Sequence, residues 1–145
     1  MECQIAVDID APAAVVWAVM SDIEHWPDWT ASVREVRRWD PHRPLRPGSR
    51  AVVRQPKLPP ALWTVTSLTP GRQFVWTAGV PLWWSTGVHT VDPVGDLPAS
   101  RATLSIKFTG LLGRLCSPLI RDLTERYIRL EAEGLKRRSE ELFRS

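Results

Sequence analysis

The feature that most constrains the fold of this chain is a series of strand-like segments joined by short turns. Alternating apolar residues, or β-branched and aromatic ones, predict strands over residues 49–55, 62–68, 74–78, 83–91 and 102–108. Proline and glycine separate these segments, and the connections are shorter than the crossovers that parallel neighbours require. The segments should therefore form an antiparallel meander, whose apolar face has to be covered by another element.

The N-terminal part adds one strand at each side of two short helices. Residues 2–9 alternate between an apolar and a polar face, so they predict a half-buried strand that can pair with an edge of the meander. A short helix should follow from about Pro12, and a second should begin at Ser21 and end before Pro27. Residues 32–39 predict a mixed, edge-like strand, and the three prolines in residues 40–48 predict a loop.

The C-terminal part, after Gly110, has the spacing of a long amphipathic helix. Apolar residues recur every three or four positions: Ile120, Leu123, Tyr127, Leu130 and Gly134 in one set, and Ile128, Ala132, Leu135, Ser139 and Leu142 in another. Acid-first pairs four residues apart are expected to support it: Asp122–Arg126, Glu125–Arg129, Glu133–Arg137 and Glu140–Arg144. Pro118 predicts a kink, or a break after a short turn at residues 111–116.

Together these elements predict an α+β fold of the helix-grip type, with residues 1–145 forming one domain. A curved seven-stranded antiparallel sheet would wrap around the long C-terminal helix, and two short helices would follow the first strand. Such a sheet leaves space beneath the helix unless large side chains fill it. A space of this kind is a common site for a small apolar molecule.

The aromatic composition supports a cavity. The chain has eight tryptophans but only one tyrosine and three phenylalanines. A domain of this size needs few tryptophans to fill its core, so the excess indicates an aromatic-walled cavity, with a tryptophan-rich core as the alternative.

Charge and cysteine content exclude several classes of protein. The net charge is +3, but the arginines are spread along the chain and alternate with acids near the C-terminus, so no nucleic-acid partner is expected. No apolar run approaches the ~20 residues of a membrane-spanning helix, and no signal sequence is evident, so a cytoplasmic location is expected. Cys3 and Cys116 are expected to be free thiols. No motif indicates a metal, a cofactor or a covalent nucleophile.

Two N-terminal stretches resemble the START-like, or Bet v 1-like, superfamily (SRPBCC), and within it the bacterial polyketide cyclase/dehydrase group. They are residues 9–17 (IDAPAAVVW) and residues 21–29 (SDIEHWPDW), which are similar to that group's "A-P…V-W…D…W-P-x-W" pattern. Residues 47–49, 63–65, 70–72 and 108–110 fall where the group has its strand and turn landmarks. The resemblance spans essentially the whole chain. It implies a cavity for lipids, polyketides or other apolar molecules, and in a minority of members a cyclisation or dehydration reaction.

Candidate ligand-binding residues come from the strands, the helical corner and the long helix: Trp26, Trp29, Arg54, Trp63, Trp76, Trp83, His89, Leu123 and Tyr127. His89 shares a strand face with Val91, which the resemblance places inward, and it is the single candidate for acid–base catalysis. The alternative is a structural histidine bonded to a neighbouring hydroxyl. Arg54 could reach a ligand carboxylate or lie at the surface.

Three functions remain open from the sequence. The first is binding of a small hydrophobic or amphipathic molecule, such as a lipid or polyketide, for carriage or sensing. The second is a cyclase, aromatase or dehydratase that uses the same cavity with neither a metal nor a covalent nucleophile. The third is a module with a filled cavity that contacts a protein or an anionic membrane. A homodimer is also left open.

Overall fold

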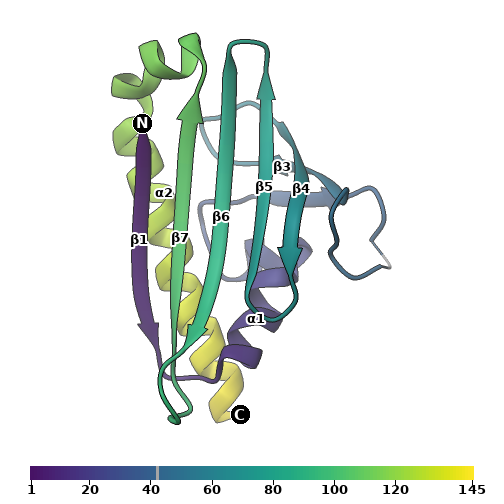
Figure 1. Cartoon of the computed structure of the whole chain (residues 1–145), viewed down its shortest axis with the longest axis vertical. Helices are drawn as coiled ribbons and strands as arrows, with labels where there is room; N and C mark the ends of the chain where they lie inside the picture. The colour runs from purple at the N-terminus through teal and green to yellow at the C-terminus, as the bar shows by residue number, and fades with distance from the viewer. Residues whose placement is uncertain (42) are drawn as a thin grey trace.

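The computed structural model describes residues 1–41 and 43–145, and it shows a seven-stranded antiparallel sheet packed against one long helix (Figure 1). The elements are β1 (Glu2–Ile9), α1 (Ala13–Ser21), the 3₁₀ helix η1 (Ile23–Asp28), β2 (Glu35–Arg38), β3 (Arg50–Arg54), β4 (Ala61–Thr69), β5 (Gln73–Val80), β6 (Trp83–Pro93), β7 (Ser100–Thr109) and α2 (Leu111–Arg144). The predicted helix-grip fold is confirmed. The loop predicted over residues 40–48 includes His42, which lies outside the described residues.

The sheet order is β1-β7-β6-β5-β4-β3-β2, so the six later strands form the predicted meander and β1 adds to its edge beside β7. Residues that lie directly opposite each other on neighbouring strands point their side chains to the same face of the sheet. His89 lies opposite Leu104 and Val91 opposite Ala102, and all four side chains are buried. The period of two therefore places His89 on the inner face of β6, as the sequence predicted.

The long helix α2 covers the inner face of this sheet (Figure 1). Its first turns lie across one end of the sheet and the rest runs along the sheet, so Pro118 accompanies a bend without ending the helix. Of the predicted apolar stripe, Ile128, Ala132, Leu135 and Ser139 are buried. The stripe, and not the charged face, therefore meets the sheet.

The corner between α1 and β2 differs from the prediction. The second short helix does not end before Pro27 but continues through it to Asp28 as a 3₁₀ helix. A single turn loses only one hydrogen bond at proline, and the corner is anchored by the Trp26 indole N–H, which donates to the Met20 carbonyl at 3.1 Å. The predicted strand over residues 32–39 is shorter, because Val33 and Val36 are both buried and this spacing breaks the alternation.

The ion pairs on α2 also differ from the prediction. None of the four acid-first pairs is within salt-bridge distance in the described structure; Arg121–Glu125 at 3.2 Å and Lys136–Glu140 at 2.7 Å form instead. Tertiary contacts explain one of these changes. The Arg137 guanidinium donates to the Trp29 carbonyl at 2.8 Å, which directs it away from Glu133.

Candidate functional site

A cavity of about 810 Å³ lies between the inner face of the sheet and the first half of α2. It takes side chains from β3 to β7, from the η1 corner and from residues 120–131 of α2. Small-molecule sites in proteins measure about 300–1,000 Å³, so this cavity is large enough for a ligand of several rings or a long acyl chain. The tryptophans contribute to its wall without filling it.

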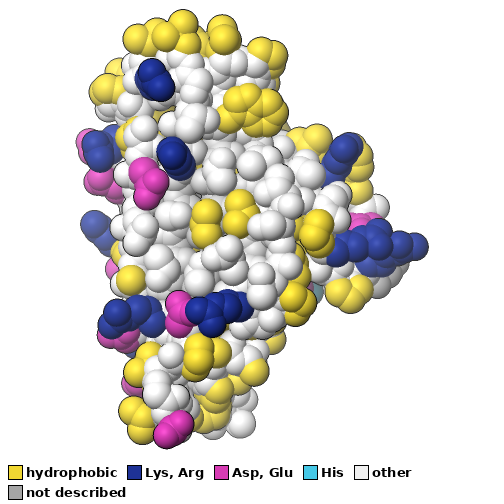
Figure 2. All heavy atoms as spheres, viewed as in Figure 1, with side chains coloured by type: hydrophobic (Ala, Val, Ile, Leu, Met, Phe, Trp, Pro, Cys, Tyr) yellow, Lys and Arg dark blue, Asp and Glu magenta, His cyan; other side chains and the backbone are white. Residues whose placement is uncertain are grey.

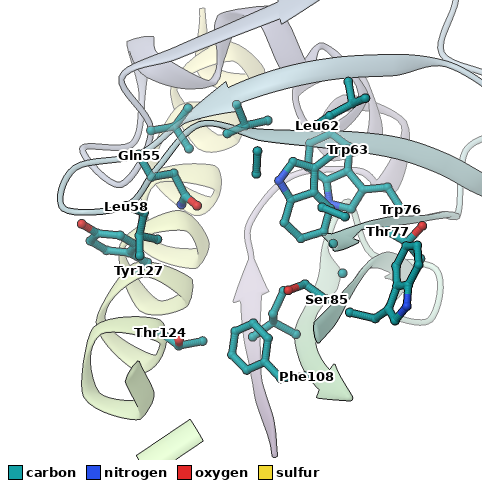
Figure 3. A pocket seen from close by; sticks show the side chains of 18 of the residues that line it. Gln55, Leu58, Leu62, Trp63, Trp76, Thr77, Ser85, Phe108, Thr124 and Tyr127 are labelled. Carbon is teal, nitrogen blue, oxygen red and sulfur yellow. The ribbon is translucent and has the colours of Figure 1, made fainter. Parts of the chain in front are cut away.

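The sheet side of the cavity is an aromatic wall (Figure 3). The rings of Trp63 and Trp76 lie 5.1 Å apart, and Trp26 contacts Trp76 edge-on at 5.3 Å. Gly87 on β6 makes room for this arrangement, because a Cβ atom there would lie only 2.9 Å from Nε1 of Trp76. Phe108 on β7 and Trp83 on β6, whose rings are 6.1 Å apart, extend the aromatic surface.

The helix side of the cavity is formed by α2. Leu123, Thr124 and Tyr127 line it, and in Figure 3 Thr124 lies on the side of the helix toward Phe108, whereas the Tyr127 ring lies beside Leu58. The Tyr127 hydroxyl donates a hydrogen bond to the Pro56 carbonyl in the β3–β4 loop. This contact ties the loop to the helix at one side of the cavity.

The cavity opens to solvent at the end of the molecule where the β3–β4 loop, the β5–β6 hairpin and α2 come together. Leu58, Leu62, Val80 and Trp84 all line the cavity and are also exposed. The entrance is therefore largely apolar, and Arg50 is the one Lys or Arg among the residues that line the cavity.

Several polar side chains also line the cavity, and two of them, His89 and Glu131, form a pair. His89 Nε2 on β6 and Glu131 Oε1 on α2 are 2.8 Å apart, with the two side chains 8% and 15% exposed. The His89 ring stacks on Phe74 at a centroid distance of 4.5 Å with an angle of 5° between the rings. The other ring nitrogen, Nδ1, is buried and has no hydrogen-bond partner among the described residues.

This geometry favours one arrangement of protons. A hydrogen on Nδ1 would be buried without an acceptor, so the neutral ring is best satisfied when Nε2–H donates to the Glu131 carboxylate. His89 then holds the carboxylate in place, and Glu131 is the more accessible member of the pair. Glu131 can accept a hydrogen bond, or a proton, from a molecule in the cavity.

Seven of the nine predicted ligand-binding residues line the cavity: Trp26, Trp63, Trp76, Trp83, His89, Leu123 and Tyr127. Two do not. Trp29 is buried against Gly134 of α2, and Arg54 points to the surface, where its Nε lies 3.1 Å from Oε1 of Glu35. Arg54 is therefore not part of the cavity.

Glu131 was not among the residues predicted from the sequence, although the sequence contains a signal for it. Glu131 is three residues after Ile128 and four before Leu135, so it falls on the apolar stripe of the helix. The partner of His89 is thus a carboxylate on the facing helix, not a hydroxyl. Among the described residues no three His, Cys, Asp or Glu side chains gather as a metal site would need.

The other ionisable groups near the helical corner lie outside the cavity. His25 Nδ1 and Asp22 Oδ2 are 2.8 Å apart at the surface, and the hydrogen bond that His25 donates to Asp22 raises the pKa of His25. Cys3 is buried and Cys116 partly buried, and both are free thiols; burial raises the pKa of Cys3.

In the described part of the chain, no helix combines the length and hydropathy needed to cross a membrane.

Comparisons with known proteins agree with this architecture. Among solved structures, the Zhui aromatase/cyclase from Streptomyces sp. R1128 is 16% identical with a TM-score of 0.76, covering 97% of this chain and 93% of that one. A START superfamily protein from Mycobacterium smegmatis is 16% identical with a TM-score of 0.76, covering 97% of this chain and 98% of that one. A protein from Thermus thermophilus, TTHA0849, is 17% identical with a TM-score of 0.70, covering 96% of this chain and 97% of that one.

At this level of identity the solved structures show the fold alone, and they agree with the helix-grip fold described above. No curated protein matches the chain. The family model described as polyketide cyclase/dehydrase and lipid transport, however, matches residues 2–140. Because this match spans nearly the whole sequence, the chain belongs to the polyketide cyclase/dehydrase and lipid transport family.

Proposed function

We propose that this protein binds an amphipathic small molecule whose apolar body occupies the cavity and whose hydroxyl or N–H group donates to Glu131. The observation that carries the proposal is the cavity of about 810 Å³, which has an aromatic wall and a single His–carboxylate pair. A carboxylate in apolar surroundings needs hydrogen-bond donors, and His89 supplies only one. The family, whose description includes lipid transport, supports a hydrophobic ligand that is carried or sensed.

The test uses N-phenyl-1-naphthylamine, a neutral apolar dye with one N–H group whose fluorescence rises in apolar surroundings. The protein should bind the dye, and Leu123→Trp, which places a large ring in the cavity, should weaken binding at least about tenfold. Leu97→Trp is the matched control, since Leu97 is 68% exposed in the β6–β7 hairpin. Circular dichroism shows whether each variant is folded.

Two results decide the outcome. Weaker binding in Leu123→Trp alone would support the cavity as the site. Dye fluorescence that does not rise, or that changes equally in both folded variants, would overturn the proposal. His89→Ala should leave affinity for this dye mostly intact, because the apolar wall supplies most of the binding surface.

A second candidate function is cyclisation or dehydration of a ligand, and the His89–Glu131 pair at 2.8 Å is the observation that favours it. Glu131 would accept a proton from an acidic CH₂ group between two carbonyls. The resulting enolate carbon would bond to a carbonyl carbon of the same chain, and Glu131 would return the proton to the new alkoxide. The cavity would position the two ends and exclude water. The aromatase/cyclase relative supports this reading only through its fold.

A synthetic linear poly-β-ketone thioester tests the second candidate, with mass spectrometry used to follow cyclised and dehydrated products. The protein should accelerate their formation, and Glu131→Gln should abolish the acceleration while dye binding persists. His89→Gln should also reduce the rate, since it loses the carboxylate's orienting donor. A rate equal to the reaction without protein would leave binding as the function of the cavity.

A further inference from the structure

One end of the molecule exposes an unusual number of large apolar side chains. We call this surface the apolar tip; its residues, each between 50% and 84% exposed, are Val80, Leu82, Trp84, Leu111, Leu115 and Leu119. In Figure 2 hydrophobic side chains gather at the upper end of the molecule, where Figure 1 places the β5–β6 hairpin and the start of α2. Scattered apolar residues are common on protein surfaces, but a group of large apolar side chains at one end of a molecule is typical of an interaction site.

Two elements build the apolar tip, and their backbones are joined directly. The Leu112 backbone N–H donates to the Leu82 carbonyl at 2.9 Å, which joins the hairpin to the first turn of α2. Gly113 packs against Phe108 and Trp83 in the same place. Leu111, Leu115 and Leu119 are spaced four apart, so they share a helix face. That face points away from the protein.

The hairpin itself shows local strain. Leu82 has a φ of 76°, a backbone conformation that leucine rarely adopts and that glycine or asparagine would adopt at lower energy. The residue at this turn is nevertheless an exposed leucine. Strained residues of this kind are often found at functional positions, and here the strain presents an apolar side chain to the outside.

Charges around the tip are basic. Lys57 in the β3–β4 loop and Arg114 on α2 are exposed and belong to no salt bridge in the described structure. Residues 105–121 contain three basic residues and no acid, although one of the three, Arg121, pairs with Glu125 at 3.2 Å. Residues 73–91 contain neither an acid nor a Lys or Arg. Glu2, opposite Lys107 in the sheet, offsets one positive charge. In Figure 2 the nearest coloured charge below the upper end is basic, and acidic side chains lie farther away.

We propose that the apolar tip docks onto an anionic lipid bilayer. Leucine side chains with a tryptophan, next to unpaired basic residues, suit the boundary between acyl chains and anionic headgroups. A second copy of the chain fits less well. A two-fold dimer through this surface would place Arg114 and Lys57 near their own copies with no acid to oppose them.

Docking in this orientation has a consequence for the cavity. Val80 and Trp84 belong to the apolar tip and also line the cavity, and Leu58 and Leu62 lie at the same entrance. A docked molecule would therefore open its cavity toward the acyl chains. An apolar ligand could then pass between bilayer and protein with little exposure to water.

The experiment is co-sedimentation of the full chain with vesicles of phosphatidylcholine alone and of phosphatidylcholine with phosphatidylserine. The protein should bind the anionic vesicles more strongly, and added salt should weaken that preference. The double variant Leu115→Ser/Leu119→Ser should reduce binding more than about tenfold, and Arg114→Glu about fivefold or more. All three side chains are exposed, so these substitutions should leave the fold intact.

Matched controls lie at the opposite end of the molecule. Leu97→Ser and Arg144→Glu change residues of the same types, also exposed, and should leave vesicle binding unchanged. The proposal is overturned if neither vesicle type binds, or if the controls lose as much binding as the tip variants. It is also overturned if Leu115→Ser/Leu119→Ser converts a dimer of the protein into a monomer and the parent protein binds neither vesicle type. The Leu115→Ser/Leu119→Ser variant should bind N-phenyl-1-naphthylamine as tightly as the parent protein. A failure of vesicle docking can therefore be distinguished from a failure of ligand binding in the cavity.

Discussion

At the scale of single residues, Gly134 sets how closely α2 approaches the helical corner. A Cβ atom at this position would lie 2.1 Å from the Trp29 carbonyl oxygen and 3.0 Å from its ring. The obstacle is partly backbone, so it cannot rotate away. The same carbonyl accepts a hydrogen bond from Arg137 at 2.8 Å, which fixes the helix against the corner.

We therefore expect Gly134→Ala to lower the free energy of unfolding by about 2 kcal/mol or more, because the added methyl forces the helix away from the corner. Gly113→Ala is the matched control on the same helix. Its Cβ atom would meet its nearest neighbours at 3.6 Å, an ordinary contact, and alanine favours the helix by about 1 kcal/mol. Urea unfolding should show the two variants moving in opposite directions, and equal losses would contradict this account.

The two members of the polar pair show what residue-level reasoning could and could not predict. His89 was placed inward correctly because the family resemblance placed Val91 inward and the side-chain period of a paired strand is fixed at two. Glu131 is 42 residues further along the chain, and its contact with His89 depends on how the helix rotates over the sheet. A sequence pattern fixes a helix face only to within the width of a broad stripe. Glu131, one charged residue inside that stripe, was therefore not singled out.

At the scale of elements, Glu140 connects α2 to the turn between β1 and α1. Its Oε2 accepts hydrogen bonds from the Asp10 backbone N–H at 2.9 Å and from Lys136 Nζ at 2.7 Å. Burial acts to raise the pKa of Glu140, but the hydrogen bonds from Lys136 and from the Asp10 N–H outweigh it, so the pKa lies below its ordinary value. The ionised carboxylate is thus favoured in the folded state.

This lowered pKa predicts a dependence of stability on pH. Since the folded protein favours ionised Glu140, the contribution is complete above the pKa of the unfolded chain, about 4.3, and is lost as the pH falls through the lower folded value. Glu140→Gln should therefore lower the free energy of unfolding by about 1 kcal/mol at pH 7, with a smaller difference below about pH 4. Urea unfolding across this pH range measures it.

Glu133→Gln provides the control for that series. Glu133 is exposed on the same helix and forms no salt bridge in the described structure, so its replacement should not alter the pH profile. A constant difference between the parent protein and Glu140→Gln from pH 7 to pH 3 would show that ionisation of Glu140 does not contribute. These contacts also bear on two of the four acid-first pairs that did not form, Glu133–Arg137 and Glu140–Arg144. Helical spacing ignores partners on other elements, and here Asp10 and Trp29 compete for the same side chains.

At the scale of the whole molecule, α2 has two halves with different surroundings. Residues 132–139 pack on the core, with Ala132, Leu135 and Ser139 almost fully buried. Residues 120–131 lie over the cavity, and Ile128 is the one buried side chain among them. Sequence periodicity treats both halves alike, because the same apolar stripe serves a packed core and an open cavity. The cavity could be expected from strand order and aromatic excess, but not its place along the helix.

This difference predicts how the helix opens. Without ligand, backbone amides of residues 120–131 should exchange hydrogen faster than those of residues 132–139, because fewer apolar contacts hold them. N-phenyl-1-naphthylamine at about one hundred times its Kd should slow exchange in the first half up to about a hundredfold, since opening then requires the dye to leave. The second half and the centre of β7 should change less. Uniform exchange along α2, or equal protection of both halves by the dye, would mean that the helix opens as one unit and that the cavity creates no local weakness.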